Sequence, residues 1–112
     1  MLTYHLVPQA EYDPQVATYL PAAWERDGFI HTTKQIALLH EVGNRYYRAD
    51  PHPYLVLTID LDRTAVPWRY DAAGADYPHL YGPLERAAII AAQPMPRAAD
   101  GAFLPLPLQS DD

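Results

Sequence analysis

Three histidines are the side chains of this sequence best suited to acid–base or metal chemistry, because imidazole changes charge near neutral pH and its neutral nitrogens bind metal ions. His5 lies in an early apolar run, His31 in a short apolar segment, and His79 in a block rich in proline and tyrosine. If three elements bring these rings together, they could hold ligand hydroxyls or, with a water, a zinc ion. No H-x-x-x-H or H-E-x-x-H spacing supports the second hypothesis, a His-metal hydrolase. His40 and His52 are interpreted as surface or loop residues.

The run Gly28-Phe-Ile-His-Thr-Thr-Lys-Gln35 joins a short predicted strand to a predicted helix. A helix N-terminus exposes unpaired N–H groups and a partial positive charge, so a phosphate or ribose could bind there with the hydroxyl of Thr32 or Thr33. The alternative is a capping box, in which Thr32 and Gln35 satisfy each other's backbone donors. The spacing favours the capping box, and the ligand site stays open as a second interpretation.

Asp60, Asp62 and Thr64 follow the most apolar run of the chain as D-x-D-x-T. This pattern resembles the way haloacid-dehalogenase-type phosphatases present a nucleophilic aspartate. Only 48 residues remain after Thr64, too few for the rest of that doubly wound fold. We interpret the aspartates as caps of a turn between two strands, with the Thr64 hydroxyl bonded to nearby backbone.

Nine tyrosines offer stacking faces with a polar tip. Those that flank the segments above are Tyr4, Tyr46, Tyr47, Tyr77 and Tyr81. They could stack on a ligand, or they could form an aromatic core with hydroxyls that reach solvent. Three arginines could each bind a ligand phosphate, although pairing with surface carboxylates is the expected role of Arg45, Arg48 and Arg69.

Apolar periodicity and turn residues predict the elements that position these side chains. Strands are predicted over Leu2–Val7, Phe29–His31, Tyr54–Ile59, Val66–Tyr70 and Ile89–Ala92. Tyr54–Ile59 is apolar on both faces and is therefore expected at the centre of the sheet.

Two helices are predicted, a short one between Asp13-Pro14 and Pro21 and a longer one from Thr33 to about Tyr47. On the longer helix, Ile36, Leu39, Gly43 and Tyr46 form one apolar face, and Gly43 permits close approach of a neighbouring element. A helical turn is expected at Leu84–Ala88 and a loop at Ala72–Ala75. The last twenty residues contain four prolines and are expected to be edge strand or coil.

The fold class predicted from these elements is a small α+β domain over residues 1–108, with a mixed or antiparallel sheet, followed by a polar tail at 109–112. The chain has 112 residues, a net charge of −6 and one lysine, Lys34, so generic nucleic-acid binding is not expected. No apolar run approaches the ~20 residues of a membrane span, and the N-terminus lacks a signal-peptide pattern. We expect a cytoplasmic protein whose oligomeric state the sequence leaves open.

Four of these segments together resemble a bacterial family known as domain of unknown function 952. They are Tyr4-His5, Gly28-Phe-Ile-His-Thr-Thr-Lys-Gln35, Ile59-Asp60 and Tyr77-Pro-His-Leu-Tyr-Gly-Pro83. That family is in turn similar in fold to the ADP-ribosyltransferases, in particular to the branch of the RNA 2′-phosphotransferases.

The resemblance implies that His5 and His31 contact NAD and that Thr33 and Gln35 line the nicotinamide side of its pocket. The expected catalytic residues are His5, His31 and His79, although His79 could instead stabilise its own loop by hydrogen bonds to backbone carbonyls. The expected nucleotide-binding set is Tyr4, His5, His31, Thr32, Thr33, Gln35 and Tyr81. Two departures argue against transfer to protein. No glutamate stands at the third position of protein-modifying transferases, and Asp71 replaces the glutamate usual before the Pro-His block.

The leading hypothesis is therefore a domain that binds an NAD- or ADP-ribose-like nucleotide in a histidine-lined cleft and that could catalyse ADP-ribosyl transfer. Cleavage of the nicotinamide–ribose bond builds positive charge on the sugar, and the sequence offers few obvious carboxylates to stabilise it. A hypothesis of another class is a non-catalytic binding or regulatory module that uses the same groove.

Overall fold

Eight strands and two α-helices form in residues 1–71 and 76–106, the part of the chain that the computed structural model describes. The predicted loop Ala72–Ala75 and the predicted tail 109–112 lie outside the described residues. The strands are β1 Leu2–Pro8, β2 Thr18–Tyr19, β3 Ile30–His31, β4 Tyr54–Asp60, β5 Trp68–Tyr70, β6 Pro78–Leu80, β7 Leu84–Glu85 and β8 Ile89–Pro94. The helices are α1 Trp24–Asp27 and α2 Leu39–Tyr46, with 3₁₀ turns η1 Gln9–Glu11, η2 Ile36–Leu38, η3 Leu61–Arg63 and η4 Arg86–Ala88.

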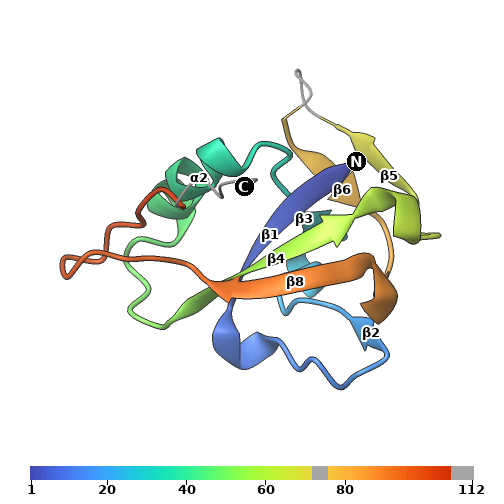
Figure 1. The fold of residues 1–112 in the computed structure, drawn as a ribbon, viewed down its shortest axis with the longest axis horizontal. Helices are drawn as coiled ribbons and strands as arrows, with labels where there is room; N and C mark the ends of the chain where they lie inside the picture. Colours follow the sequence, from blue (N-terminus) through green and yellow to red (C-terminus); the bar gives the residue numbers. More distant parts are fainter. Residues whose placement is uncertain (72–75, 107–112) are drawn as a thin grey trace, which may run out of the picture.

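The main sheet has the order β1-β4-β8, and all its pairings are antiparallel. It crosses the middle of the molecule in Figure 1, with α2 to one side and with β5 and β6 near the N-terminal end of β1. Val56 and Leu57 of β4 are both fully buried, each in a different core cluster. The central position predicted for this strand is confirmed, because only a strand covered on both faces buries successive side chains.

A second sheet of order β3-β6-β5 carries two of the three histidines. It is joined to the main sheet where Tyr4 and Thr33 exchange two backbone hydrogen bonds, of 2.9 and 2.8 Å. This link fixes the segment after β3 beside β1, although the two are far apart in the sequence. A third pairing, β2 with β7, completes an antiparallel α+β fold.

The helix predicted between Asp13 and Pro21 does not form. The Asp13 carboxylate instead accepts a hydrogen bond from the backbone N–H of Gln15, and Thr18–Tyr19 pairs with β7. An aspartate that bonds its own backbone two residues on favours a turn over a helix. The short helix lies after Pro21, as α1.

The longer helix begins later than predicted, and the prediction that Thr32 and Gln35 form a capping box is wrong. The Thr32 hydroxyl donates to the carbonyl of Pro78 at 2.6 Å, Gln35 Nε2 donates to Asp76 at 3.3 Å, and Thr33 is paired with Tyr4. Tertiary partners therefore take the groups that would cap a local helix, and the helical geometry starts with η2 at Ile36. The two threonines do not stand at a helix N-terminus, so an anion bound beside them would not gain the partial positive charge of a helix end, as the second interpretation required.

Close approach at Gly43 is confirmed, since an added Cβ would lie 2.7 Å from Cγ of Phe103. Tyr46, predicted on the same apolar face, is instead 67% exposed. In the described part of the chain, no helix combines the length and the apolar character that crossing a membrane requires.

Candidate functional site

The reversal between α1 and β3 places Asp27 beside His31. Gly28 ends α1 in the left-handed conformation, at φ 74°, which only glycine adopts without strain. His31 Nε2–H then donates to Asp27 Oδ2 at 2.8 Å, and Arg26 donates to both oxygens of Asp27 at 2.8 and 3.1 Å. The hydrogen bonds from Arg26 and, second, from His31 lower the pKa of Asp27 to about 2. Asp27 is therefore a fixed negative charge on one edge of the His31 ring.

The pairing of β3 with β6 sets His31 directly opposite His79. Cross-strand partners share one face of the sheet, and the two rings lie with their centroids 5.5 Å apart at 68°. Phe29 stacks on His79, at 3.9 Å and 16°, and lies 4.5 Å from His31. One phenylalanine therefore holds both imidazoles in place.

His79 is oriented in the same way as His31. Its Nδ1–H donates to Asp71 Oδ2 at 2.9 Å, and Arg69 Nε donates to Asp71 Oδ1 at 2.5 Å. The hydrogen bonds from Arg69 and then from His79 hold the pKa of Asp71 below its usual range. Each histidine thus belongs to an Arg–Asp–His chain and keeps one ring nitrogen, Nδ1 of His31 and Nε2 of His79, that hydrogen-bonds to nothing else among the described residues.

His5 and His31 line one hollow, as the sequence predicts, but both ring nitrogens of His5 are bonded within the protein. Its Nδ1–H donates to the backbone carbonyl of His31 at 2.6 Å, and its Nε2 accepts from the Tyr19 hydroxyl at 2.7 Å. The ring is 5% exposed, and burial lowers its pKa to about 4. His5 is therefore a neutral side chain that ties β1 to β3 and β2 and fixes the backbone of His31.

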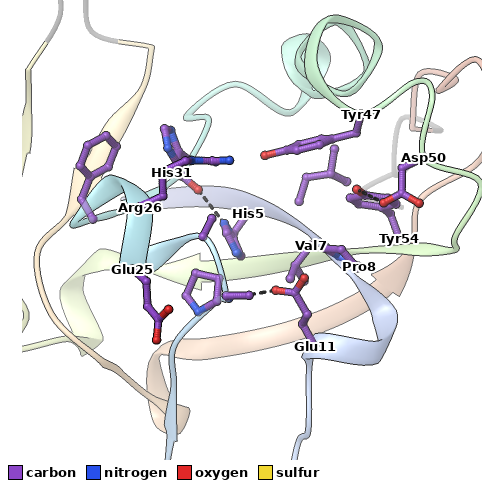
Figure 2. Close-up of a pocket in the computed structure, with 15 residues that line it drawn as sticks. His5, Val7, Pro8, Glu11, Glu25, Arg26, His31, Tyr47, Asp50 and Tyr54 are labelled. Carbon is purple, nitrogen blue, oxygen red and sulfur yellow. Dashed lines mark hydrogen bonds between the residues drawn. The ribbon is translucent and has the colours of Figure 1, made fainter.

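Two adjoining hollows surround these residues. The larger, the His79 hollow, has a volume of about 770 Å³, and its lining includes Arg26, Asp27, His31, Thr32, Thr33, Glu41, Arg45, Tyr46, Tyr47, Tyr77 and His79. The smaller, the Glu11 hollow, has a volume of about 460 Å³, and its lining includes His5, Glu11, Glu25, Arg26, His31, Tyr47, Asp50 and Tyr54. Arg26, His31 and Tyr47 line both and form the boundary between them. Figure 2 shows the Glu11 hollow, with Glu11 and Glu25 on one side and Tyr47, Asp50 and Tyr54 on another.

Several predicted site residues line neither of these hollows. Tyr4 contributes its backbone to the link with Thr33, and Gln35 bonds to Asp76. Tyr81 lies against Arg69, whose guanidinium carbon is 4.3 Å from the ring centroid. Thr32 does line the His79 hollow, but its hydroxyl is taken by buried bonds with Thr3 and Pro78.

Arg26 and Asp27 line the His79 hollow and were not predicted from the sequence. Their only signal is the Asp27-Gly28 turn shortly before His31. Of the three predicted arginines, Arg48 and Arg69 pair with the carboxylates of Asp100 and Asp71. Arg45 lines the hollow and has no carboxylate oxygen within 4.0 Å among residues 1–71 and 76–106.

The turn interpretation of D-x-D-x-T is confirmed. Asp60 caps η3 by accepting a hydrogen bond from the backbone N–H of Asp62, and the Thr64 hydroxyl accepts one from the N–H of Val66. The described residues contain no group of three side chains placed to hold a metal ion. His5, the third histidine of the metal hypothesis, has both nitrogens bonded within the protein.

The sequence profile of the family described as "Protein of unknown function (DUF952)" matches residues 7–92. The chain belongs to the DUF952 family. Its structure is similar to two crystal structures of protein CC0527 from Caulobacter crescentus, one of them of a double mutant, with a TM-score of 0.74 and 24% identity for each, over 93% of this chain and 94% of the other. The solution NMR structure of CC0527 matches with a TM-score of 0.65 and 26% identity, over 89% of each chain. No curated protein matches the chain. These similarities establish the fold.

Proposed function

We propose that this protein binds a nucleotide of the NAD or ADP-ribose type across the boundary between the His79 hollow and the Glu11 hollow. The observation that carries the proposal is that the two hollows adjoin at Arg26, His31 and Tyr47 but differ in charge. Two arginines and two carboxylates line the His79 hollow, whereas one arginine and three carboxylates line the Glu11 hollow. A dinucleotide has the same division, with an anionic diphosphate in the middle and an uncharged or cationic ring at one end.

The His79 hollow suits the phosphates. Arg45 lines it without a carboxylate partner among the described residues, and a guanidinium binds phosphate through paired N–H groups. Arg26 also lines the hollow, although its charge is shared with Asp27, and Glu41 adds a second carboxylate to the lining. The volume of about 770 Å³ lies within the range of about 300–1,000 Å³ typical of small-molecule sites.

Tyrosine rings offer places for the base. Tyr46 and Tyr77 line the His79 hollow and are 67% and 40% exposed. Exposed aromatic faces bind a nucleobase by stacking and add about 1–3 kcal/mol for each base. The adenine of the ligand is therefore expected against one of these two rings.

The Glu11 hollow repels phosphate, because three carboxylates, of Glu11, Glu25 and Asp50, face one arginine there. The same charges attract a cationic ring, such as oxidised nicotinamide, and Tyr47 and Tyr54 give it aromatic neighbours. In this orientation Thr33 stands on the phosphate side of the ligand, not beside nicotinamide. His5 acts as a positioning residue, since it holds the backbone of His31.

Melting temperatures measured with and without millimolar NAD and ADP-ribose test the proposal. A ligand present at ten times its Kd stabilises the folded state by about 1.4 kcal/mol, which raises the melting temperature of a domain of this size by several degrees. Arg45→Ala is expected to remove most of that rise. Arg86→Ala, on η4 and outside both hollows, is the matched control and is expected to keep it. No rise with either ligand in the wild type would leave the proposal without support.

Nicotinamide release measures whether bound NAD is also cleaved. Release from NAD in the presence of phosphorylated RNA or candidate proteins, abolished by His31→Ala, would assign transfer to the site. A melting shift without release would assign a binding module.

A further inference from the structure

We propose that His31 and His79 are a general base–general acid pair that hydrolyses a nucleoside cyclic phosphodiester held in the His79 hollow. The proposal rests on the proposed function in one respect, since it needs a nucleotide in the same hollow. It goes beyond binding, because it assigns a reaction to two residues that nucleotide binding alone does not require.

The arrangement of the two rings supports this assignment. Their centroids are 5.5 Å apart, both rings line the hollow, and Phe29 packs against both. One nitrogen of each ring is bonded to a carboxylate, and the other has no partner among residues 1–71 and 76–106. A carboxylate that accepts from one ring nitrogen fixes the tautomer and stabilises the imidazolium that forms during proton transfer.

The bonded neighbours of the two rings are alike, and Glu41 and Arg45 of α2 line the hollow that both rings share. Arg26 and Asp27 come to His31 from α1, and Arg69 and Asp71 come to His79 from β5 and the residue after it. The two histidines differ in access to water, because the side chain of His31 is 51% exposed and that of His79 is 15% exposed. The more exposed His31 is therefore assigned as the base that activates water, and His79 as the acid.

The reaction consumes one water molecule. The oxygen of this water attacks phosphorus while His31 Nδ1 takes a proton from it, and a new P–O bond forms. The P–O bond to one ribose oxygen breaks, and the leaving oxygen takes the proton from Nε2 of the His79 imidazolium. The product is a nucleoside monophosphate, and the two histidines return to their starting states by proton exchange with solvent.

The same chemistry indicates which kind of phosphate bond the pair would cleave. A general acid speeds the reaction most where the leaving oxygen is strongly basic, as a ribose alkoxide is. It speeds the reaction little where the leaving group is a weakly basic phosphate. This favours a sugar phosphodiester over a diphosphate. Arg45 lies in the same hollow and can hold the single negative charge of such an ester.

Adenosine 2′,3′-cyclic phosphate is the probe, with adenosine 3′,5′-cyclic phosphate as the second substrate and AMP as the product measured by chromatography. The wild-type protein is expected to form AMP from at least one of them, with a bell-shaped dependence of kcat on pH. A wild type that forms no AMP above an enzyme-free blank between about pH 5 and pH 9 would overturn the proposal.

Two substitutions separate catalysis from structure. His31→Gln replaces Nε2 and His79→Asn replaces Nδ1 with an amide N–H, so each keeps the bond to its aspartate and loses the second nitrogen. Each is expected to lower kcat at least ~100-fold with a melting temperature near that of the wild type.

His52→Asn is the matched control. His52 Nδ1 also bonds a carboxylate, that of Asp50, at 2.5 Å, but His52 is 74% exposed and lines neither hollow. The control is expected to keep the wild-type kcat, and an equal loss in all three variants would contradict the assignment. NAD binding without AMP formation removes this inference alone, whereas AMP formation without a melting shift in NAD or ADP-ribose removes the proposed NAD-type ligand alone.

Discussion

At the scale of single residues, the neutral, buried His5 organises the site. Its two hydrogen bonds join the His31 carbonyl on β3 to the Tyr19 hydroxyl on β2. Removing one partner of a buried hydrogen bond leaves the other unsatisfied, which costs about 1–3 kcal/mol. Tyr19→Phe keeps the ring contacts of Tyr19 and should lower the free energy of unfolding by this amount, as measured by urea denaturation. Tyr12→Phe, whose hydroxyl has no partner among the described residues, should change it by less than ~0.5 kcal/mol.

His5 also sets a pH dependence. Burial lowers its pKa from 6.5 to about 4 in the folded state. Below pH 6.5 the unfolded chain therefore binds a proton that the folded chain does not, and stability falls as pH decreases from 6.5 toward 4. The full loss is about 3 kcal/mol, at about 1.36 kcal/mol for each pKa unit. Urea unfolding at several pH values should show this loss. The free energy of unfolding of His5→Gln should depend less on pH over the same range. An equal pH dependence in both proteins would contradict this account.

At the scale of elements, strands that depend on apolar pattern were predictable and segments that depend on distant partners were not. Tyr54–Ile59 was placed correctly because its side chains are buried on both faces. The segment Thr32–Gln35 has a helix-start pattern, but Tyr4, Asp76 and Pro78 take its polar groups. The site residues also fall into those that were predictable from their own segment and those that were not. His31 and His79 carry signals in their own segments, whereas Asp27 becomes a site residue only through the reversal at Gly28.

Packing between α2 and the C-terminal segment gives a prediction at this scale. Alanine is a better helix former than glycine by about 1 kcal/mol, but a Cβ at Gly43 would lie 2.7 Å and 2.9 Å from ring atoms of Phe103. Gly43→Ala should therefore destabilise the fold by about 1–3 kcal/mol through overpacking. Gly82→Ala is the control, because the nearest contact of its Cβ would be Val66 at 3.3 Å. It should destabilise the fold less than Gly43→Ala, and urea denaturation of both variants measures the difference.

At the scale of the whole molecule, charge limits the class of ligand. The chain carries a net charge of −6, and the Glu11 hollow adds a local excess of carboxylates. A protein this acidic has too few cations to replace the counterions of a nucleic acid, so duplex DNA and single-stranded RNA should not bind at about 100 mM salt. Fluorescence anisotropy of labelled oligonucleotides measures this, and salt-sensitive binding at micromolar protein would contradict it.

A small nucleotide avoids this limit, because its few phosphates need only the local cations of the His79 hollow. The most direct test of nucleotide binding is a crystal structure grown with saturating ADP-ribose. We predict electron density for the diphosphate within hydrogen-bond distance of the Arg45 guanidinium, with the adenine against Tyr46 or Tyr77. Ligand density outside both hollows, or no ligand density in either hollow, would contradict the account.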